Sequence, residues 1–201
     1  DRLQGEPRGD LLSLMVHSPA TRDLSPGEFL GNLINLIVGG NDTTRNSLTG
    51  GVVALNRHPA QYARLRADPG LIPDMVPEII RWQTPISHMA RTAKTDVEVA
   101  GRTIRAGDRV ALWYLSGNRD ETAIERPEEF VIGRAQPRRH LSFGFGAHHC
   151  VGYRLAELQL QVAWEEIIKR FHTVEVVGSP TRVCSNVIHG YTSLPVRLHR
   201  W

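Results

Sequence analysis

Cysteine and aromatic residues are scarce in this chain of 201 residues. There are two cysteines, Cys150 and Cys184, and phenylalanine, tryptophan and tyrosine together make up 6%. Two cysteines cannot build the disulfide framework that holds small secreted domains together, and we expect Cys184 to be a small buried residue. The basic residues are scattered and have few aromatic neighbours, so we expect no nucleic acid as a partner.

Long hydrophobic runs are also missing. No stretch approaches the ~18 consecutive apolar residues that span a bilayer, and no basic-then-apolar leader opens the sequence. We therefore expect a cytoplasmic protein without a transmembrane segment. The hydrophobic share of 41%, the charged share of 22% and the net charge of +3 are typical of a globular domain. The chain starts at Asp1 without methionine, and we interpret it as a fragment.

Helical signals dominate, so the sequence predicts a mainly α fold with small β regions. Ser25-Pro26-Gly27-Glu28 combines a capping residue, a proline at the first helical position and a capping box. The pattern after it predicts one helix of about 30 residues, or ~45 Å. Helices are also expected over 11–16, 60–67, 73–83 and 152–171, the last with four apolar residues on one side: Leu155, Leu158, Val162 and Ile167.

Alternating patterns predict short strands elsewhere. Residues 97–104 are expected to turn at Gly101, and a further strand is expected over 110–114. Near the C-terminus, Val187-Ile188 and Tyr191 flank His189-Gly190, which predicts the tip of a hairpin.

The stretch 143–152, Phe-Gly-Phe-Gly-Ala-His-His-Cys-Val-Gly, is the most informative in the chain. Cys150 stands directly before a helical pattern, and the positive end of a helix stabilises the thiolate that binds metals. Gly144, Gly146 and Gly152 permit sharp turns and leave room for a flat ligand. The stretch therefore indicates an axial thiolate ligand for haem iron. A zinc site built from His140, His148, His149 and Cys150 is a rival interpretation, although adjacent His149 and Cys150 suit one tetrahedral site poorly.

Two further patterns each allow two interpretations. Gly39 and Gly40 interrupt the long helix at a cost of roughly 1 kcal/mol each, which indicates either a close helix crossing or a groove for a small ligand. In the second case Asp42 and Thr43 supply an acid and a hydroxyl for proton delivery. Glu78 and Arg81 share a helix face, and by themselves they would be read as a surface ion pair.

Together these motifs resemble the cytochrome P450 family. Its haem-binding signature has every fixed position filled here, and the acid–alcohol and Glu-x-x-Arg motifs occur in the family's order. The resemblance covers residues 1–201 as a partial domain, the family's C-terminal half, with the N-terminal half absent. Four stretches resemble the bacterial alkane hydroxylases of the family: 39–47, 76–85, 114–121 and 140–160. The signature residues are Phe143, Gly144, Gly146, His148, Cys150 and Gly152.

The resemblance implies a haem-thiolate monooxygenase. Such an enzyme inserts one atom of O2 into an unactivated C–H bond, here by terminal hydroxylation of medium-chain alkanes or fatty acids. The alternative substrate is a terpenoid or a steroid. The remote alternative is a protein without catalysis: a haem-binding, gas-sensing or zinc-binding module, or a mere interaction surface. The cofactor is haem b (iron protoporphyrin IX). Electrons come from NAD(P)H through a ferredoxin reductase and a ferredoxin, which Arg138, Arg139 and Arg154 could dock unless they only form a solvated face.

The resemblance also implies roles for single residues. Arg91, His140 and His148 are candidate partners of the haem propionates. Glu78 and Arg81 form a buried pair with a third partner, for which Arg134 is the candidate because the chain has Glu129-Phe130 where relatives often have an arginine before phenylalanine. The substrate contacts, unless they are core residues, are Leu36, Gly39, Ile86, Met89 and Ile188. Without the family's N-terminal half, we expect the 201 residues alone to be inactive and to bind haem weakly or not at all.

Overall fold

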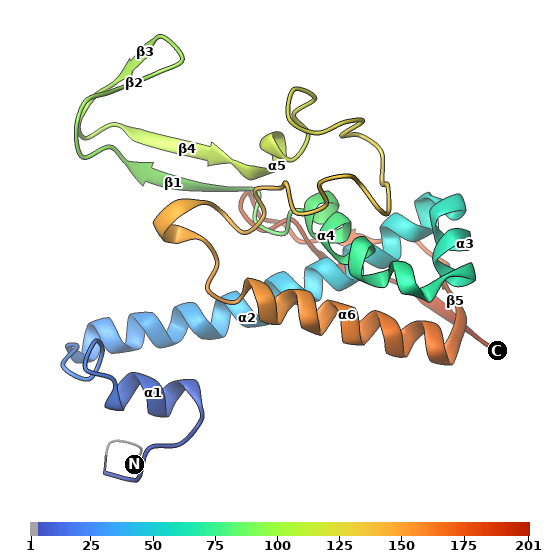
Figure 1. Cartoon of the computed structure of the whole chain (residues 1–201), viewed down its shortest axis with the longest axis horizontal. Coiled ribbons are helices and arrows are strands. Elements are labelled where there is room, and N and C mark those ends of the chain that lie inside the picture. Colours follow the sequence, from blue (N-terminus) through green and yellow to red (C-terminus); the bar gives the residue numbers. More distant parts are fainter. Residues whose placement is uncertain (1–3) are drawn as a thin grey trace. The chain divides into compact units, whose positions relative to one another are not determined.

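The computed structural model describes residues 4–201 and is mainly helical with small two-stranded sheets (Figure 1). It divides into two compact units, one up to Asp42 and one over Thr43–Trp201. The helices are α1 (Leu11–His17), α2 (Pro26–Arg57), α3 (Pro59–Ala67), α4 (Ile72–Gln83), α5 (Tyr114–Gly117) and α6 (Tyr153–Arg170), with short 3-10 turns η1 (Pro69–Leu71) and η2 (Gly146–His148). Among the described residues, no helix is both long and apolar enough to cross a membrane.

The long helix α2 begins at the predicted capping box. The Ser25 backbone N–H donates to the Glu28 carboxylate at 3.0 Å, and the Glu28 N–H donates to the Ser25 hydroxyl oxygen at 3.3 Å. This arrangement satisfies two of the N–H groups that a helix start leaves without partners. The predicted helices 11–16, 60–67, 73–83 and 152–171 are confirmed to within a residue or two at each end.

Small sheets account for the strands. β1 (His88–Thr92) pairs antiparallel with β4 (Arg109–Trp113), and β2 (Val97–Val99) pairs with β3 (Arg102–Ile104) at the far end of that ribbon (Figure 1). β5 (Phe171–Val176) pairs with β8 (Val196–Arg200), and β6 (Thr181–Arg182) pairs with β7 (Tyr191–Ser193). The sequence analysis did not single out β1, β5 or β8 as strands, although the residues of β8, Val-Arg-Leu-His-Arg, alternate between apolar and polar.

The predicted hairpin tip at His189-Gly190 is wrong in detail. Tyr191 pairs with Arg182, so the hairpin turn is longer than expected. Ile188 instead forms an isolated antiparallel bridge with Ile86, more than a hundred residues earlier. A contact this distant in sequence leaves no local signal, and Val187-Ile188 therefore looked like half of a hairpin.

The apolar residues that indicated α6 are not the ones that this helix buries in the structure. Leu155, Leu158 and Val162 are exposed, by 48–58% of their surface. The buried side chains of α6 are instead Leu160, Trp164 and Ile168. Both sets keep helical spacing, so periodicity alone could not decide between them. Cys184, expected to be buried, is exposed as well.

The core of the second unit is built where α2, α4 and α6 meet. Ile79 and Trp164 are fully buried there. A Cβ built on Gly51 of α2 would lie 2.7 Å from Ile79 Cδ1 and 3.1 Å from Trp164 Cζ2. Glycine is therefore needed at Gly51 for the close approach of these helices.

The close helix packing thus occurs further along α2 than the sequence predicts. A Cβ built on Gly39 or Gly40 meets no described atom within 4 Å, outside its chain neighbours and the backbone of α2 itself. Of the two interpretations offered for that glycine pair, a close helix crossing has no support in this structure.

Candidate functional site

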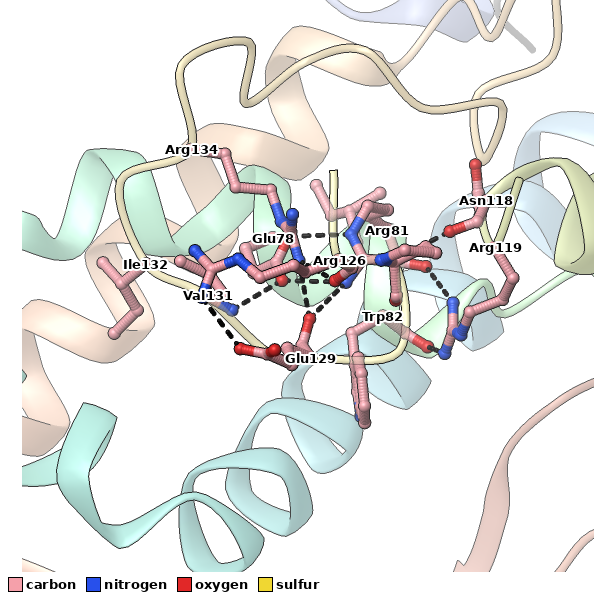
Figure 2. A network of polar contacts seen from close by, with 12 residues as sticks. Glu78, Arg81, Trp82, Asn118, Arg119, Arg126, Glu129, Val131, Ile132 and Arg134 are labelled. Carbon is pink, nitrogen blue, oxygen red and sulfur yellow. Dashed lines mark hydrogen bonds and ion pairs between the residues drawn. The ribbon is translucent and has the colours of Figure 1, made fainter. Parts of the chain in front are cut away.

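A buried ion-pair network joins α4 to the loop that follows α5 (Figure 2). The Arg81 guanidinium donates to both carboxylate oxygens of Glu78 at 2.8 Å, and both side chains are only 1% exposed. Arg134 Nε donates to the same carboxylate at 2.9 Å. One carboxylate therefore holds two arginines, and the Glu78–Arg81 pair is buried rather than on the surface.

The same arginines bind the backbone of the loop that follows α5. Arg81 donates to the carbonyl oxygens of Asn118, Pro127 and Glu129 at 2.8–3.0 Å. Arg134 donates to the carbonyl oxygen of Glu129 at 2.6 Å. The network therefore satisfies the charges of both guanidinium groups and fixes the course of residues 118–134.

Asn118 connects this network to the cysteine loop, and the sequence analysis missed it. The residue is completely buried. Its Nδ2 donates to the hydroxyl oxygens of Thr84 and Ser142 at 2.8 Å, and its Oδ1 accepts from the Leu141 N–H at 2.6 Å. Every side-chain donor and acceptor of the buried amide is used. A single asparagine after a short helix follows no periodic pattern that predicts such burial, and the resemblance over residues 114–121 covered Asn118 without assigning it a role.

Backbone hydrogen bonds shape the cysteine loop, residues 143–152. The Cys150 N–H donates to the Phe143 carbonyl oxygen at 2.8 Å, which closes the loop on itself. Gly144 and Gly146 adopt left-handed φ angles of 70° and 67°, which favour glycine over other residues. The Cys150 thiol is free and exposed, three residues before α6 begins at Tyr153. The loop therefore presents a thiol at the N-terminal end of a helix of 18 residues.

His140 is the most unusual polar side chain near this loop. Both ring nitrogens are buried without a hydrogen-bond partner. Burial lowers the pKa of His140 to about 4, and the positive charges of Arg81 and Arg138 act in the same direction. A buried imidazole without partners can donate to an approaching carboxylate, which makes His140 a fitting partner for an acidic group such as a haem propionate.

The other two propionate candidates are more accessible. Arg91 lies on β1 and donates to the Ala90 carbonyl oxygen at 2.8 Å. His148 is exposed at the end of η2. Together with the free Cys150 thiol and the orphaned His140 ring, these residues fit a haem group, although their roles stay predictions.

The zinc alternative is not supported by the geometry. Over residues 4–201, no group of three or more histidine, cysteine, aspartate or glutamate side chains could hold a metal ion. His140, His148, His149 and Cys150 therefore do not converge on one point. The His149 ring instead lies edge-to-face against Tyr153, with the ring centroids 4.9 Å apart.

The candidate residues of α2 lie around the boundary between the two units. Leu36, Gly39 and Asp42 belong to the first unit, and Thr43 begins the second. All four lie on one continuous helix. Gly39, Asp42 and Thr43 each take part in interactions, and their part in proton delivery or substrate contact stays a prediction.

Two of the candidate substrate contacts lie side by side. Ile86 and Ile188 are partners in the isolated bridge between the segment after α4 and the turn before β7. Met89 follows on β1 and is 43% exposed. The structure therefore brings together two of these apolar residues, Ile86 and Ile188, from distant parts of the chain.

Comparison with known proteins decides the family. The family model described as "Cytochrome P450" matches residues 70–188, more than half of the chain. The chain belongs to the cytochrome P450 family. The match includes the Glu78–Arg134 network and the Cys150 loop of this P450 chain.

Curated relatives and solved structures agree. The chain is 43% identical, over 190 residues, to a methyl-branched lipid omega-hydroxylase of Mycobacterium bovis, covering 93% of this chain and 44% of that one. It is 38% identical to a linalool 8-monooxygenase of Pseudomonas putida, covering 97% and 48%. The crystallised cytochrome P450-153 of Novosphingobium aromaticivorans is 52% identical with a TM-score of 0.93, covering 98% and 49%. This P450 chain therefore spans about half the length of the relatives it matches.

Proposed function

We propose that the protein is a haem-thiolate monooxygenase in which Cys150 is the axial ligand of haem iron. The free, exposed thiol of Cys150, presented at the start of α6 on a loop with the family signature, carries this proposal. The 201 residues form the C-terminal half of the enzyme's single domain, and an N-terminal half completes it. This division accords with the relatives, of which the chain covers 44–48%.

Different residues of this chain bind different parts of the haem. Cys150 holds the iron through its thiolate, and His140, Arg91 and His148 donate to the propionates. Bound haem b supplies the redox chemistry that activates O2. Glu78, Arg81 and Arg134 fix the loop that leads to the cysteine, while the carboxylate of Asp42 and the hydroxyl of Thr43 would hold and pass a proton.

Electrons must reach this site from outside, and we assign a ferredoxin and its NAD(P)H-dependent reductase to that role in the cytoplasm. Arg139 and Arg154 are exposed, basic residues close in sequence to the cysteine loop. Arg138 is already engaged by Glu157 at 3.0 Å, so we expect it to contribute less to a docking surface for an acidic partner.

For the substrate, we propose the terminal carbon of medium-chain alkanes or fatty acids. Ile86, Ile188 and Met89 offer an apolar set without charge. The 43% identity to a lipid omega-hydroxylase and the 52% identity to a cytochrome P450-153 also favour an aliphatic chain. A terpenoid is the second candidate, favoured by the 38% identity to a linalool 8-monooxygenase.

The test is a reduced carbon monoxide difference spectrum of the full-length protein. We expect a Soret band at the thiolate-ligated position, lost in Cys150→Ala and kept in Cys184→Ala, which removes the other free cysteine. Absence of the band in folded, haem-loaded protein would overturn the monooxygenase proposal. Product analysis with n-alkanes and with linalool then decides between the substrates.

A further inference from the structure

The turn that carries Ile188 is fastened to the segment after α4 by backbone and side-chain hydrogen bonds. The Ser87 N–H donates to the Val187 carbonyl oxygen at 2.8 Å, and the His189 N–H donates to the Pro85 carbonyl oxygen at 2.9 Å. The Ser87 hydroxyl donates to the Asn186 carbonyl oxygen at 2.9 Å. These bonds set the distance between the Ile86 and Ile188 backbones.

The His189 side chain adds a further contact between this turn and the last residue of α4. Its Nδ1 contacts the carbonyl oxygen of Gln83, the last residue of α4, and its Nε2 lies 2.7 Å from Arg182 Nη1. In return, Gln83 Nε2 donates to the His189 carbonyl oxygen at 2.6 Å. Gln83 is 2% exposed, so this exchange takes place at the edge of the core.

The two neighbours of the ring allow only one protonation state. A carbonyl oxygen can only accept and a guanidinium can only donate. Nδ1 must therefore carry the hydrogen, and Nε2 must offer its lone pair to Arg182. A second proton on Nε2 would point at the guanidinium and replace an attraction with a repulsion.

The charges around the ring also disfavour that second proton. Arg182 of β6, which itself lies over the Tyr191 ring of β7 at 4.5 Å, is one cation, and Arg119, after α5, is another. Burial lowers the pKa of His189 most, and both arginines lower it further. The backbone contacts with Gln83 and Thr84 act in the opposite direction.

We propose that His189 is a positioning residue that holds the Ile86–Ile188 pair in place, and that protonation of its Nε2 breaks the contact with Arg182 and so weakens the hold of the turn 183–190 on the end of α4. That this pair faces the substrate rests on the proposed function, but the fastening itself does not. Because the pKa of His189 is lowered on folding, the fastening is complete above the ordinary histidine pKa of about 6.5. It is lost as the pH falls through the lowered value.

The first test is amide hydrogen exchange of the haem-loaded full-length protein between about pH 7.5 and pH 5, a range chosen around the ordinary histidine pKa. After correction for intrinsic exchange rates, we expect the protection factors of the Ser87 and His189 amides to fall at least tenfold on acidification. His189→Asn can still donate to the Gln83 carbonyl oxygen and does not titrate, so its protection should not change with pH. His199→Asn, which alters an exposed histidine paired with Glu175, should keep the wild-type profile.

A second variant covers the case in which His189→Asn does not fold. Arg182→Met removes one of the two cations, so the midpoint of release should move to higher pH. Protection independent of pH in the wild-type protein, or an unmoved midpoint in Arg182→Met, would overturn the proposal.

The second readout links the fastening to the substrate. The dissociation constant of an n-alkane, which has no titratable group, is measured by spectral titration over the same pH range. We expect binding to weaken several-fold on acidification in the wild type and to stay constant in His189→Asn. If exchange behaves as expected but no alkane binds at any pH, the proposed substrate fails while the fastening stands. If alkanes bind equally at all pH values although the turn is released, the positioning role fails.

Discussion

Asn118 donates from its Nδ2 to the hydroxyl oxygen of Ser142, 24 residues later, at 2.8 Å. Ser142 passes the connection on, because its hydroxyl donates to the carbonyl oxygen of Ile80 in α4 at 2.8 Å. One buried amide thus ties the end of α5, the C-terminal part of α4 and the start of the cysteine loop together.

Replacing Asn118 with leucine should destabilise the protein by about 2–4 kcal/mol. The change keeps the size of the side chain but leaves the Leu141 N–H without its acceptor, and Thr84 and Ser142 without their donor. Urea unfolding measures the loss. Asn32→Leu, at an exposed asparagine that bonds only within α2, should change the free energy of unfolding by less than about 0.5 kcal/mol. Equal effects of the two substitutions would contradict the assigned role.

Breaking the charge network should be costly as well. Glu78→Gln leaves Arg81 and Arg134 with uncompensated charge in a buried site, and we expect a loss of about 3–5 kcal/mol. The matched control is Glu157→Gln, which breaks the pair with the largely exposed Arg138 and should cost less than about 1 kcal/mol. Thermal unfolding followed by circular dichroism compares them. A Glu78→Gln protein as stable as the control would mean that the network contributes little.

The helix crossing at Gly51 can be tested with a single methyl group. Gly51→Ala places a Cβ too close to Ile79 and Trp164, and we expect a loss of about 1–3 kcal/mol from overpacking. Gly31→Ala lies in the same helix with no described atom near its Cβ, so the better helix propensity of alanine should stabilise by up to about 1 kcal/mol. In chemical denaturation, we expect the two substitutions to change the free energy of unfolding in opposite directions. A stabilising Gly51→Ala would show that the packing is looser than described.

His140 should make the haem-free protein less stable in mild acid. Its pKa is lowered to about 4 by burial and by nearby positive charge. The contribution of neutral His140 to the free energy of unfolding is therefore complete above about pH 6.5. It is lost as the pH falls toward 4, by at most about 3 kcal/mol. His140→Phe removes the titrating group and should flatten this part of the curve of unfolding free energy against pH. An unchanged slope in the variant would assign the pH dependence to other groups.

Local patterns predicted what depends on neighbouring residues. The capping box at Ser25 and the helix ends near Pro26 and Pro59 follow from hydrogen bonding and proline geometry within a few residues. The sequence also indicated the long helix, the β2–β3 turn at Gly101 and the thiol of Cys150 at the start of a helix. The capping, turn and cysteine signals are each complete within a few residues, and the long helix follows from a periodic pattern that runs locally along the chain.

What the sequence could not predict depends on contacts between distant segments. The choice of Trp164 over Leu158 as a buried residue of α6 is made by Gly51 in another helix. The bridge between Ile86 and Ile188 and the burial of Asn118 are likewise decided by partners far along the chain. Arg134 reaches Glu78 across 56 residues, and only the resemblance to a family, not the spacing itself, suggested it.

The arginines of the central network mostly bind peptide oxygens, and this has a consequence for how the loop can vary. Arg81 contacts the carbonyl groups of Asn118, Pro127 and Glu129 rather than their side chains. Every amino acid offers the same carbonyl oxygen, so residues at most loop positions can be exchanged without breaking the hydrogen bonds to Arg81. A change of loop length would instead shift all three carbonyl groups out of register with a guanidinium of fixed shape. Most positions of this loop should therefore tolerate substitutions, whereas insertions and deletions should not be tolerated.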